Sequence, residues 1–455
     1  MGDLLIHPSG PLRGTVTTPG DKSITHRALM LSALAEGTTA IEGWVPAEVC
    51  LATLRCMRQM GAEIEEREDA LIVTGVGPRG LCEPDDVLHC AGSGTTMRLL
   101  AGIAAGQPFT TVLTGTEPLR RRPMGRVAGP LRLMGATVLG RHGGTLPPLT
   151  IRGGGLRGID YSLPVASAQV KSAILLAALF AAGETVLHEP GPSRDHTERM
   201  LRWFGVEVAS QGRDVGLLGG QILRPPAGAD ALPVLTIPGD FSSAAFPLVA
   251  ASIVPGSSIC LRRTGANTSR TGLYDLLVRM GGDVALSASD LPGAALPDEM
   301  HEPIADVQVR HAALRATEVA GDLVVRAIDE FPIFAVLATQ AEGDTVVREA
   351  AELRVKESDR IATVAAELRK MGAAIDELPD GMIVHGPTRL RGATVACHRD
   401  HRLAMALAVA GLVASGTTTV KSAEAIDDSF PGFVETMQAL GANIAWVDAE
   451  PRRDV

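Results

Sequence analysis

The sequence predicts an α/β protein made of two similar lobes, and three observations support this fold class. The stretch "TPGDKSITHRALM" (18–30) returns at 237–249 as "IPGDFSSAAFPLV", so the chain repeats itself. Within each half, a unit of helix, turn, strand, second helix and strand recurs three times, which indicates a repeat architecture. The chain also has 455 residues, more than a single hydrophobic core usually supports.

The six units are marked by the glycine that follows each second helix. Glycine is favoured there because the residue after a helix often takes a left-handed conformation, which costs glycine little. The helix ends are "MGAEI" (60–64), "MGATV" (134–138), "FGVEV" (204–208), "MGGDV" (280–284), "MGAAI" (371–375) and "LGANI" (440–444). The turns into strands read "EGTTAI", "AGETVL", "PGSSIC", "EGDTVV" and "SGTTTV"; the second unit is less regular, and residues 285–325 lengthen the fourth.

Composition and charge restrict the function classes. The net charge of −10 argues against a general nucleic-acid surface. The six cysteines form no CxxC pair and no zinc spacing, so we expect reduced thiols and no metal site. The longest apolar runs, 172–182 and 403–414, are too short to span a bilayer, and the start does not read as a signal peptide. We therefore expect a cytoplasmic protein with no membrane or nucleic-acid partner.

Five segments of the first half place cations or small polar residues near helix starts, where free N–H groups attract anions. They are "DKSITHR" (21–27), "AGSGTTMR" (91–98), "LRRRPMGR" (119–126), "ASAQVKSA" (166–173) and "PSRDHTERM" (192–200). These segments also allow a purely structural interpretation. Ser23 and Ser167 would then be helix caps, the arginine run a solvated loop and His196 a structural histidine.

Three segments of the second half carry charges beside apolar helices. They are "AIDEFPIF" (327–334), "LRVKESDR" (353–360) and "HRDHRLAMALA" (398–408). Asp329 is either a helix cap or a general base at a buried junction. Lys356 and Arg360 are spaced i,i+4, so we expect them on one helical face, where a shared anionic partner would offset their repulsion. A solvated helix is the alternative.

Together these segments favour a binding site over separate structural roles, because they recur at the same point of the repeat. The residues expected at the start of the first helix of each unit are Lys22, Gly94, Ser167, Ser242, Asp329 and Asp400. If the three units of a lobe pack around a pseudo-threefold axis, their helix starts converge at one end of that lobe. This arrangement predicts a strongly anion-attracting cleft.

The order of "GDKSITHR", "RPMGR", "SAQVKSA", "LRVKESDR" and "DHRLAM" closely resembles the 5-enolpyruvylshikimate-3-phosphate (EPSP) synthase family of enolpyruvyl transferases, in particular its bacterial class-II group. The resemblance runs through nearly the whole chain, to "SFPGF" (429–433). It implies two lobes, each of three βαβαββ repeats around buried helices, an inside-out α/β barrel. It also implies one lobe from residues 21–240 and another from residues 1–20 plus 241–455.

The resemblance implies a reaction that needs no metal or organic cofactor. In the family, the 5-hydroxyl of shikimate 3-phosphate attacks C2 of phosphoenolpyruvate while C3 gains a proton, and the adduct then loses phosphate and the proton to give EPSP. The implied catalytic residues are Lys22, Asp329 and Glu357. The residues implied for shikimate 3-phosphate are Lys22, Ser23, Arg27, Ser167, Ala168, Gln169, Ser193, Arg194, Asp329 and Lys356. Those implied for phosphoenolpyruvate are Lys22, Gly94, Arg122, Gln169, Arg360 and Arg402.

The sequence departs from many family members at some of these segments. Gly92 stands in place of Asn, Ala168 of Ser, His196 of Tyr, Glu352 of Asn and Asp428 of Lys. Asp428 removes a cation from the phosphoenolpyruvate side, so Arg122, Arg360 and Arg402 would have to compensate. Gly94 is the small residue of herbicide-sensitive relatives, so we expect glyphosate to compete with phosphoenolpyruvate.

The same residues argue against three other functions. UDP-N-acetylglucosamine enolpyruvyl transferases share the fold and the donor but carry a loop cysteine before the Arg-Pro segment, and here no cysteine lies between Cys90 and Cys260. RNA 3′-phosphate cyclases need a catalytic histidine and ATP, for which the chain shows no signature. A catalytically silent paralogue used as a binding module is disfavoured because Lys22, Asp329 and Glu357 are all present. We expect a monomer.

Overall fold

The computed structural model describes residues 2–226, 231–289 and 299–448. The chain forms two compact units. The N-terminal unit is Gly20–Pro238 with Pro297–Glu302, and the C-terminal unit is Met1–Pro19, Gly239–Leu296 and Pro303–Val455. Residues 299–302 belong to the N-terminal unit, although the family resemblance implied a lobe of 1–20 plus 241–455. The division into lobes at residues 20 and 240 stays a prediction.

The described residues form six four-stranded sheets, three in each unit, and all six have the same plan. The first two strands of each order are parallel and the remaining pairs antiparallel. In the N-terminal unit the orders are β14 (Val234–Thr236), β3 (Glu36–Glu42), β5 (Ala70–Val76), β4 (Glu63–Glu66); β6 (Leu88–His89), β7 (Thr110–Thr114), β9 (Leu146–Arg152), β8 (Thr137–Gly140); and β10 (Asp160–Ser162), β11 (Glu184–His188), β13 (Asp214–Leu218), β12 (Val208–Gln211).

The C-terminal unit repeats this plan, with the parallel pair first in each sheet. Its orders are β2 (Arg13–Thr17), β15 (Ser258–Gly265), β17 (Ile304–Arg310), β16 (Asp283–Ala288); β18 (Glu318–Val319), β19 (Gly343–Val347), β21 (Gly381–Gly386), β20 (Ala374–Leu378); and β22 (Thr394–Ala396), β23 (Thr418–Lys421), β1 (Gly2–Ile6), β24 (Ile444–Asp448). The last sheet therefore takes its third strand from the beginning of the chain.

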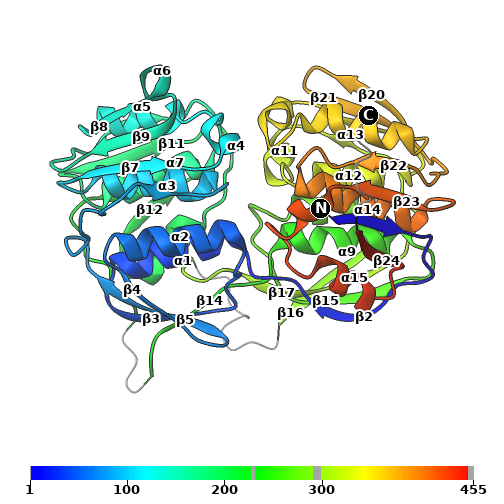
Figure 1. The fold of residues 1–455 in the computed structure, drawn as a ribbon, viewed down its shortest axis with the longest axis horizontal. Coiled ribbons are helices and arrows are strands. Elements are labelled where there is room, and N and C mark those ends of the chain that lie inside the picture. The colour runs from blue at the N-terminus through cyan, green and yellow to red at the C-terminus, as the bar shows by residue number, and fades with distance from the viewer. Residues whose placement is uncertain (1, 227–230, 290–298, 449–455) are drawn as a thin grey trace. The chain divides into compact units, whose positions relative to one another are not determined.

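Two kinds of helix alternate along the chain (Figure 1). The first helix of each repeat is buried on nearly all sides, and the second is amphipathic and buries one face. The buried helices are α1 (Lys22–Leu34), α3 (Gly94–Ala105), α7 (Ala168–Ala178), α9 (Phe241–Ile253), α12 (Phe331–Thr339) and α14 (His401–Val413). The amphipathic helices are α2 (Glu48–Gln59), α5 (Gly125–Leu133), α8 (His196–Trp203), α10 (Gly272–Arg279), α13 (Arg360–Lys370) and α15 (Phe433–Ala439). Short helices are α4 (Glu117–Arg120), α6 (Arg141–Gly144) and α11 (Asp322–Arg326), with 3₁₀ turns η1 (Ala351–Val355) and η2 (Ala423–Ile426).

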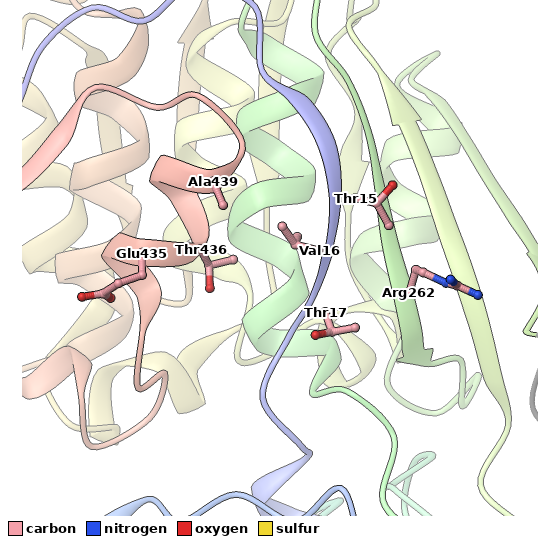
Figure 2. A pocket seen from close by; sticks show the side chains of 7 residues that line it. All are labelled: Thr15, Val16, Thr17, Arg262, Glu435, Thr436 and Ala439. Carbon is pink, nitrogen blue, oxygen red and sulfur yellow. The ribbon is translucent and has the colours of Figure 1, made fainter.

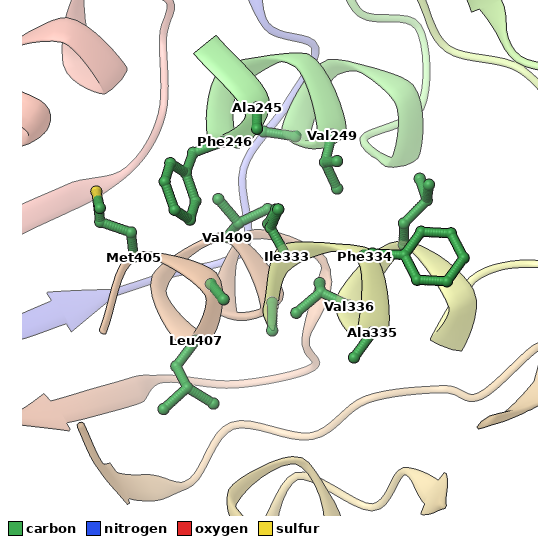
Figure 3. Packing of buried hydrophobic residues seen from close by; sticks show 14 of the residues in the cluster. Ala245, Phe246, Val249, Ile333, Phe334, Ala335, Val336, Met405, Leu407 and Val409 are labelled. Carbon is green, nitrogen blue, oxygen red and sulfur yellow. The ribbon is translucent and has the colours of Figure 1, made fainter. Parts of the chain in front are cut away.

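The order of elements confirms the predicted βαβαββ repeat around buried helices. In the C-terminal unit, α9, α12 and α14 pack against one another, and Figure 3 shows Phe246, Ile333 and Val409 pointing into the shared core. The glycine predicted after each second helix has a positive φ in every repeat, as a left-handed helix end requires. These residues are Gly61, Gly135, Gly205, Gly281, Gly372 and Gly441.

The two Pro-Gly-Asp copies lie where the chain passes from one unit to the other. The Asp21 N–H donates to the Pro238 carbonyl, and the Asp240 N–H donates to the Pro19 carbonyl, each at 2.8 Å. A Cβ atom on Gly20 would lie only 1.9 Å from the Gly43 carbonyl oxygen, so no larger residue fits there without moving backbone. Each Pro-Gly-Asp copy thus donates one backbone hydrogen bond to the other copy and accepts one from it.

The strand before each passage is exchanged. The chain runs from β2 into α1, yet β2 pairs with β15; it runs from β14 into α9, yet β14 pairs with β3. In the other repeats, the strand before the buried helix pairs with the strand that follows this helix. Here β2 and β14 have exchanged these positions between the two units. Sequence repetition alone shows the unit but not this exchange, because strand pairing is decided by contacts between distant segments.

His188 on β11 and His385 on β21 each lie between two carboxylates of the neighbouring strands. His188 bonds to Asp160 at 3.0 Å and Asp214 at 2.8 Å. His385 bonds to Asp344 at 2.8 Å and Asp376 at 3.0 Å. The main cause that raises the pKa of each histidine is the hydrogen bond that its ring donates to a carboxylate, Asp214 for His188 and Asp376 for His385.

We expect the double variant His188→Asn/His385→Asn to show a weaker pH dependence of the free energy of unfolding. A histidine with a raised pKa stabilises the folded state fully below its unfolded-state pKa of about 6.5, and this contribution is lost as pH rises through the folded-state pKa. Urea unfolding at about pH 5.5 and about pH 8.5 measures the difference. The control is His142→Asn on α6. Identical pH slopes for the double variant and the parent would contradict the expectation.

Candidate active site

The start of α1 holds the first group of predicted residues. Asp21, not Ser23, is the N-cap, and its carboxylate accepts from the Ile24 N–H at 3.1 Å. The capping alternative for Ser23 is therefore wrong. Lys22 and Ser23 are the first two helical residues and both are half-buried. Their side chains are thus placed at the positive end of a buried helix, which favours anions.

Arg27 lies one turn further along α1 and is almost completely buried. Its Nε donates to Thr197 Oγ1, one terminal nitrogen to the Ser23 carbonyl and the other to Ser172 Oγ, each at 2.7 Å. Burial lowers its pKa to about 10, and Glu198 is the strongest opposing influence. The guanidinium remains charged at neutral pH and is fixed by three partners.

The start of α3 is a second anion-facing element, capped by Ser93. A Cβ on Gly94 would lie 2.9 Å from a terminal nitrogen of Arg98 and 3.1 Å from one of Arg122. Glycine thus makes room for two guanidinium groups at a helix start. Arg98 also donates to Gln169 Oε1, while the Gln169 amide donates to Thr95 Oγ1 at 2.9 Å. Arg98 belongs to the segment "AGSGTTMR" (91–98), but no role was predicted for it.

The start of α7 brings Ser167, Ala168 and Gln169 together. Ser167 is the N-cap, and its hydroxyl accepts from the Val170 N–H at 3.5 Å. All three are half-buried, as are Ser193 and Arg194 before α8. Ser193 Oγ is buried and has no hydrogen-bond partner within the described ranges. The N-terminal unit therefore gathers hydroxyl, amide and cationic groups at the starts of α1, α3 and α7.

The C-terminal unit gathers three cations around one carboxylate. Asp329 lies 3.6 Å from Arg360, 3.9 Å from Lys356 and 3.9 Å from Arg402, measured between carboxylate oxygens and side-chain nitrogens. Asp329 does not cap α12, whose N-cap is Glu330, so the cap alternative for Asp329 is wrong. A carboxylate with several cations nearby fits proton transfer in an anion site.

Arg360 is the centre of this group, and its side chain is 1% exposed. Its Nε donates to Asp400 at 2.8 Å and its Nη2 to Glu357 at 2.8 Å. Burial alone would lower its pKa, but Asp400 and then Glu357 raise it above the ordinary value. Burial also lowers the pKa of Lys356, against the attraction of Asp329.

The predicted helical face shared by Lys356 and Arg360 is wrong. Lys356 ends the 3₁₀ turn η1, and α13 begins only at Arg360. The two cations still meet, because both lie near Asp329. Their common anionic partner thus includes a carboxylate from the chain itself.

Three positions at which the sequence departs from many family members are exposed, namely Asp428, Glu352 and Gly92. A Cβ on Gly92 would meet only Thr116 Oγ1, at 3.9 Å. Glu352 is among the carboxylates that oppose the lowering of the Lys356 pKa. A groove of about 470 Å³ is lined by residues of β2 and α15 and by Arg262, and Figure 2 shows these side chains. None of the predicted site residues lines it. Within the described ranges, no cluster of His, Cys, Asp and Glu is arranged to hold a metal ion, and no helix has the length and apolarity of a membrane span.

Known proteins match this chain over nearly its whole length. The family model described as EPSP synthase (3-phosphoshikimate 1-carboxyvinyltransferase) matches residues 6–437. The 3-phosphoshikimate 1-carboxyvinyltransferase of Brevibacillus brevis is 52% identical over 430 residues, covering 94% of this chain and 98% of the relative. That of Desulforudis audaxviator is 51% identical over 438 residues, covering 96% and 99%.

Solved structures show the same fold. EPSP synthase from Acinetobacter baumannii superimposes with a TM-score of 0.87 at 42% identity, over 98% of this chain and all of that one (100%). The enolpyruvyl transferase NikO from Streptomyces tendae has a TM-score of 0.79 at 19% identity, covering 99% of each chain, which shows the fold alone. With full-length relatives at half identity and cations and carboxylates placed at the helix starts, the chain belongs to the EPSP synthase family, the 3-phosphoshikimate 1-carboxyvinyltransferases.

Proposed function

We propose that the side chains described above carry out the family reaction, the transfer of the enolpyruvyl group of phosphoenolpyruvate to the 5-hydroxyl of shikimate 3-phosphate. The observation that carries the assignment of residues is the group of Lys356, Arg360 and Arg402 around Asp329. Three cations at one carboxylate suit a site that binds anions and moves a proton. The Nη1 of Arg360 is buried and has no hydrogen bond within the described ranges, which leaves a donor for a ligand.

Shikimate 3-phosphate is proposed to bind mainly to the N-terminal unit. Its phosphate needs charge and N–H donors, and its ring hydroxyls need neutral hydrogen-bonding groups. The helix starts of α1 and α7 supply both kinds of group. The proposed contacts are Lys22, Ser23, Arg27, Ser167, Ala168, Gln169, Ser193 and Arg194, with Asp329 and Lys356 from the C-terminal unit.

Phosphoenolpyruvate carries a phosphate and a carboxylate, both suited to guanidinium forks. The proposed contacts are Lys22, Gly94, Arg122, Gln169, Arg360 and Arg402. Arg360 stays charged because Asp400 and Glu357 raise its pKa. The position Asp428, which is exposed, contributes no cation, so the binding of phosphoenolpyruvate depends on these arginines.

Asp329 and Glu357 are proposed to handle the protons, together with Lys22. The attacking 5-hydroxyl must lose a proton while C3 of phosphoenolpyruvate gains one, and the second step reverses the proton transfer at C3 as phosphate leaves. Preorganised cations stabilise the charge that develops on the departing phosphate. We further propose that the protein works as a cytoplasmic monomer, binds neither nucleic acid nor membranes, and is inhibited by glyphosate.

The reaction itself is tested by phosphate release from phosphoenolpyruvate. We expect release with shikimate 3-phosphate and none with UDP-N-acetylglucosamine or without an acceptor. Release that depends on UDP-N-acetylglucosamine would assign the other enolpyruvyl transfer. No release with any acceptor, from protein shown to be folded by circular dichroism, would favour a binding paralogue.

Lys22→Met is expected to keep the fold and to lower kcat by roughly 10³-fold. The substitution removes the charge at the start of α1 while Asp21 still caps the helix. Steady-state kinetics and thermal unfolding measure the two effects. The control is Lys370→Met, which removes an exposed lysine at the end of α13. Wild-type turnover in Lys22→Met would overturn the assignment.

Gly94→Ala is expected to raise the inhibition constant of glyphosate, by roughly tenfold or more, with a smaller rise in KM for phosphoenolpyruvate. The new methyl group would press on Arg98 and Arg122, since its Cβ would lie 2.9 Å and 3.1 Å from their nitrogens. Inhibition kinetics at fixed shikimate 3-phosphate measure the change. Gly129→Ala is the matched control because a Cβ there meets nothing within 4 Å. Equal glyphosate constants for Gly94→Ala and the parent would count against the role of Gly94.

A further inference from the structure

The first turn of α8 contains three consecutive polar residues that are all buried. His196, Thr197 and Glu198 are 0%, 1% and 2% exposed. Each contacts a different part of the N-terminal unit: His196 Nδ1 lies 2.7 Å from Glu302, Thr197 Oγ1 accepts from Arg27 at 2.7 Å, and Glu198 lies 2.6 Å from Lys171. Buried polar groups are costly unless paired, so this turn is held in one place by its partners.

Lys171 is the residue that connects this turn to α7. Its side chain is 2% exposed, and its ammonium group lies 2.8 Å from Glu189 and 2.6 Å from Glu198. Burial alone would lower its pKa, but Glu198 and Glu189 raise it. Glu189 directly follows β11. One ammonium group thus links a buried helix, the end of a strand and the first turn of α8.

Arg27 depends on the same junction. Its Nε and one terminal nitrogen donate to Thr197 and Ser172, whose hydroxyl groups lie 2.6 Å from each other. Ser172 is the neighbour of Lys171 on α7, and Thr197 is the neighbour of Glu198 on α8. Glu198 is also the carboxylate that most favours the charged form of Arg27. The position and charge of Arg27 are therefore set where α7 meets α8.

We propose that Lys171 is a positioning residue for shikimate 3-phosphate, acting through Glu198 and Thr197 on Arg27. Lys171 is separated from the substrate by these side chains, so it touches no reacting atom. Without its ammonium group, nothing joins residues 189 and 198, so the first turn of α8, and with it Thr197, is no longer held in place. The inference rests on the proposed role of Arg27 in binding this substrate. It predicts a defect in shikimate 3-phosphate binding that phosphoenolpyruvate binding does not share.

The test compares three variants. Lys171→Met should raise the Kd and KM for shikimate 3-phosphate about tenfold or more, with kcat and the KM for phosphoenolpyruvate changed less than about threefold. Lys171→Arg, which can still bridge both carboxylates, should stay within about threefold of the parent for both substrates. Lys171→Met/Glu189→Gln/Glu198→Gln has no unpaired buried carboxylate, so it should recover stability while shikimate 3-phosphate affinity stays low.

Calorimetric titration of shikimate 3-phosphate, steady-state kinetics and thermal unfolding give the readouts. The control is Asp3→Asn, which removes the partner of Lys421 at 2.6 Å and should lower stability without changing either KM. Equal rises in the KM for both substrates, or unchanged shikimate 3-phosphate affinity in the folded triple variant, would overturn the proposal. If the Lys171→Met protein fails to fold, the shikimate 3-phosphate affinity of the triple variant still tests the proposal. A parent protein that does not bind shikimate 3-phosphate would instead overturn the proposed function.

Discussion

The C-terminal unit depends on keeping a guanidinium group charged where almost no water reaches it. Arg360 achieves this through Asp400, which is itself 0% exposed and holds the Arg360 Nε at 2.8 Å. Asp400 is also the N-cap of α14, where it accepts from the Arg402 N–H at 3.0 Å. One carboxylate therefore begins a buried helix and orients the central cation. Removing a partner from such a buried pair typically costs about 3–5 kcal/mol, so fold and site are held by the same contact.

The N-terminal unit solves the same problem with a different arrangement. Arg27 is surrounded by hydroxyl and carbonyl oxygens, and the compensating charge comes from Glu198, which it shares with Lys171. Neutral acceptors orient a guanidinium without cancelling its attraction for a phosphate. Glu198, the main balancing carboxylate, is paired with Lys171. This separation of orienting groups from compensating groups suits the binding of a phosphate that we propose for this unit.

Local sequence signals predicted the repeat, the buried helices and the helix-ending glycines, because each depends on residues close together in the chain. The position of Asp329 between Lys356, Arg360 and Arg402 followed only from the family resemblance and the structure, since the partners come from three segments. The cap at Asp21 in place of Ser23 reflects competition between two adequate capping residues. The contacts of Arg98 and the proposed role of Lys171 were not predicted, because the sequence does not show which groups pair with a single cation beside an apolar helix.

The placement of β1 has a consequence for how the chain folds. β1 precedes every other described element, yet it pairs with β23 at Leu4 and Val420 and with β24 at Ile6 and Ile444. The third sheet of the C-terminal unit therefore cannot close until β23 and β24 have been synthesised. The residues 20–238, in contrast, are complete much earlier and have their own core, and domains generally fold as units in the order of synthesis. The first of the described strands thus finds its sheet partners only after the last of them has been made.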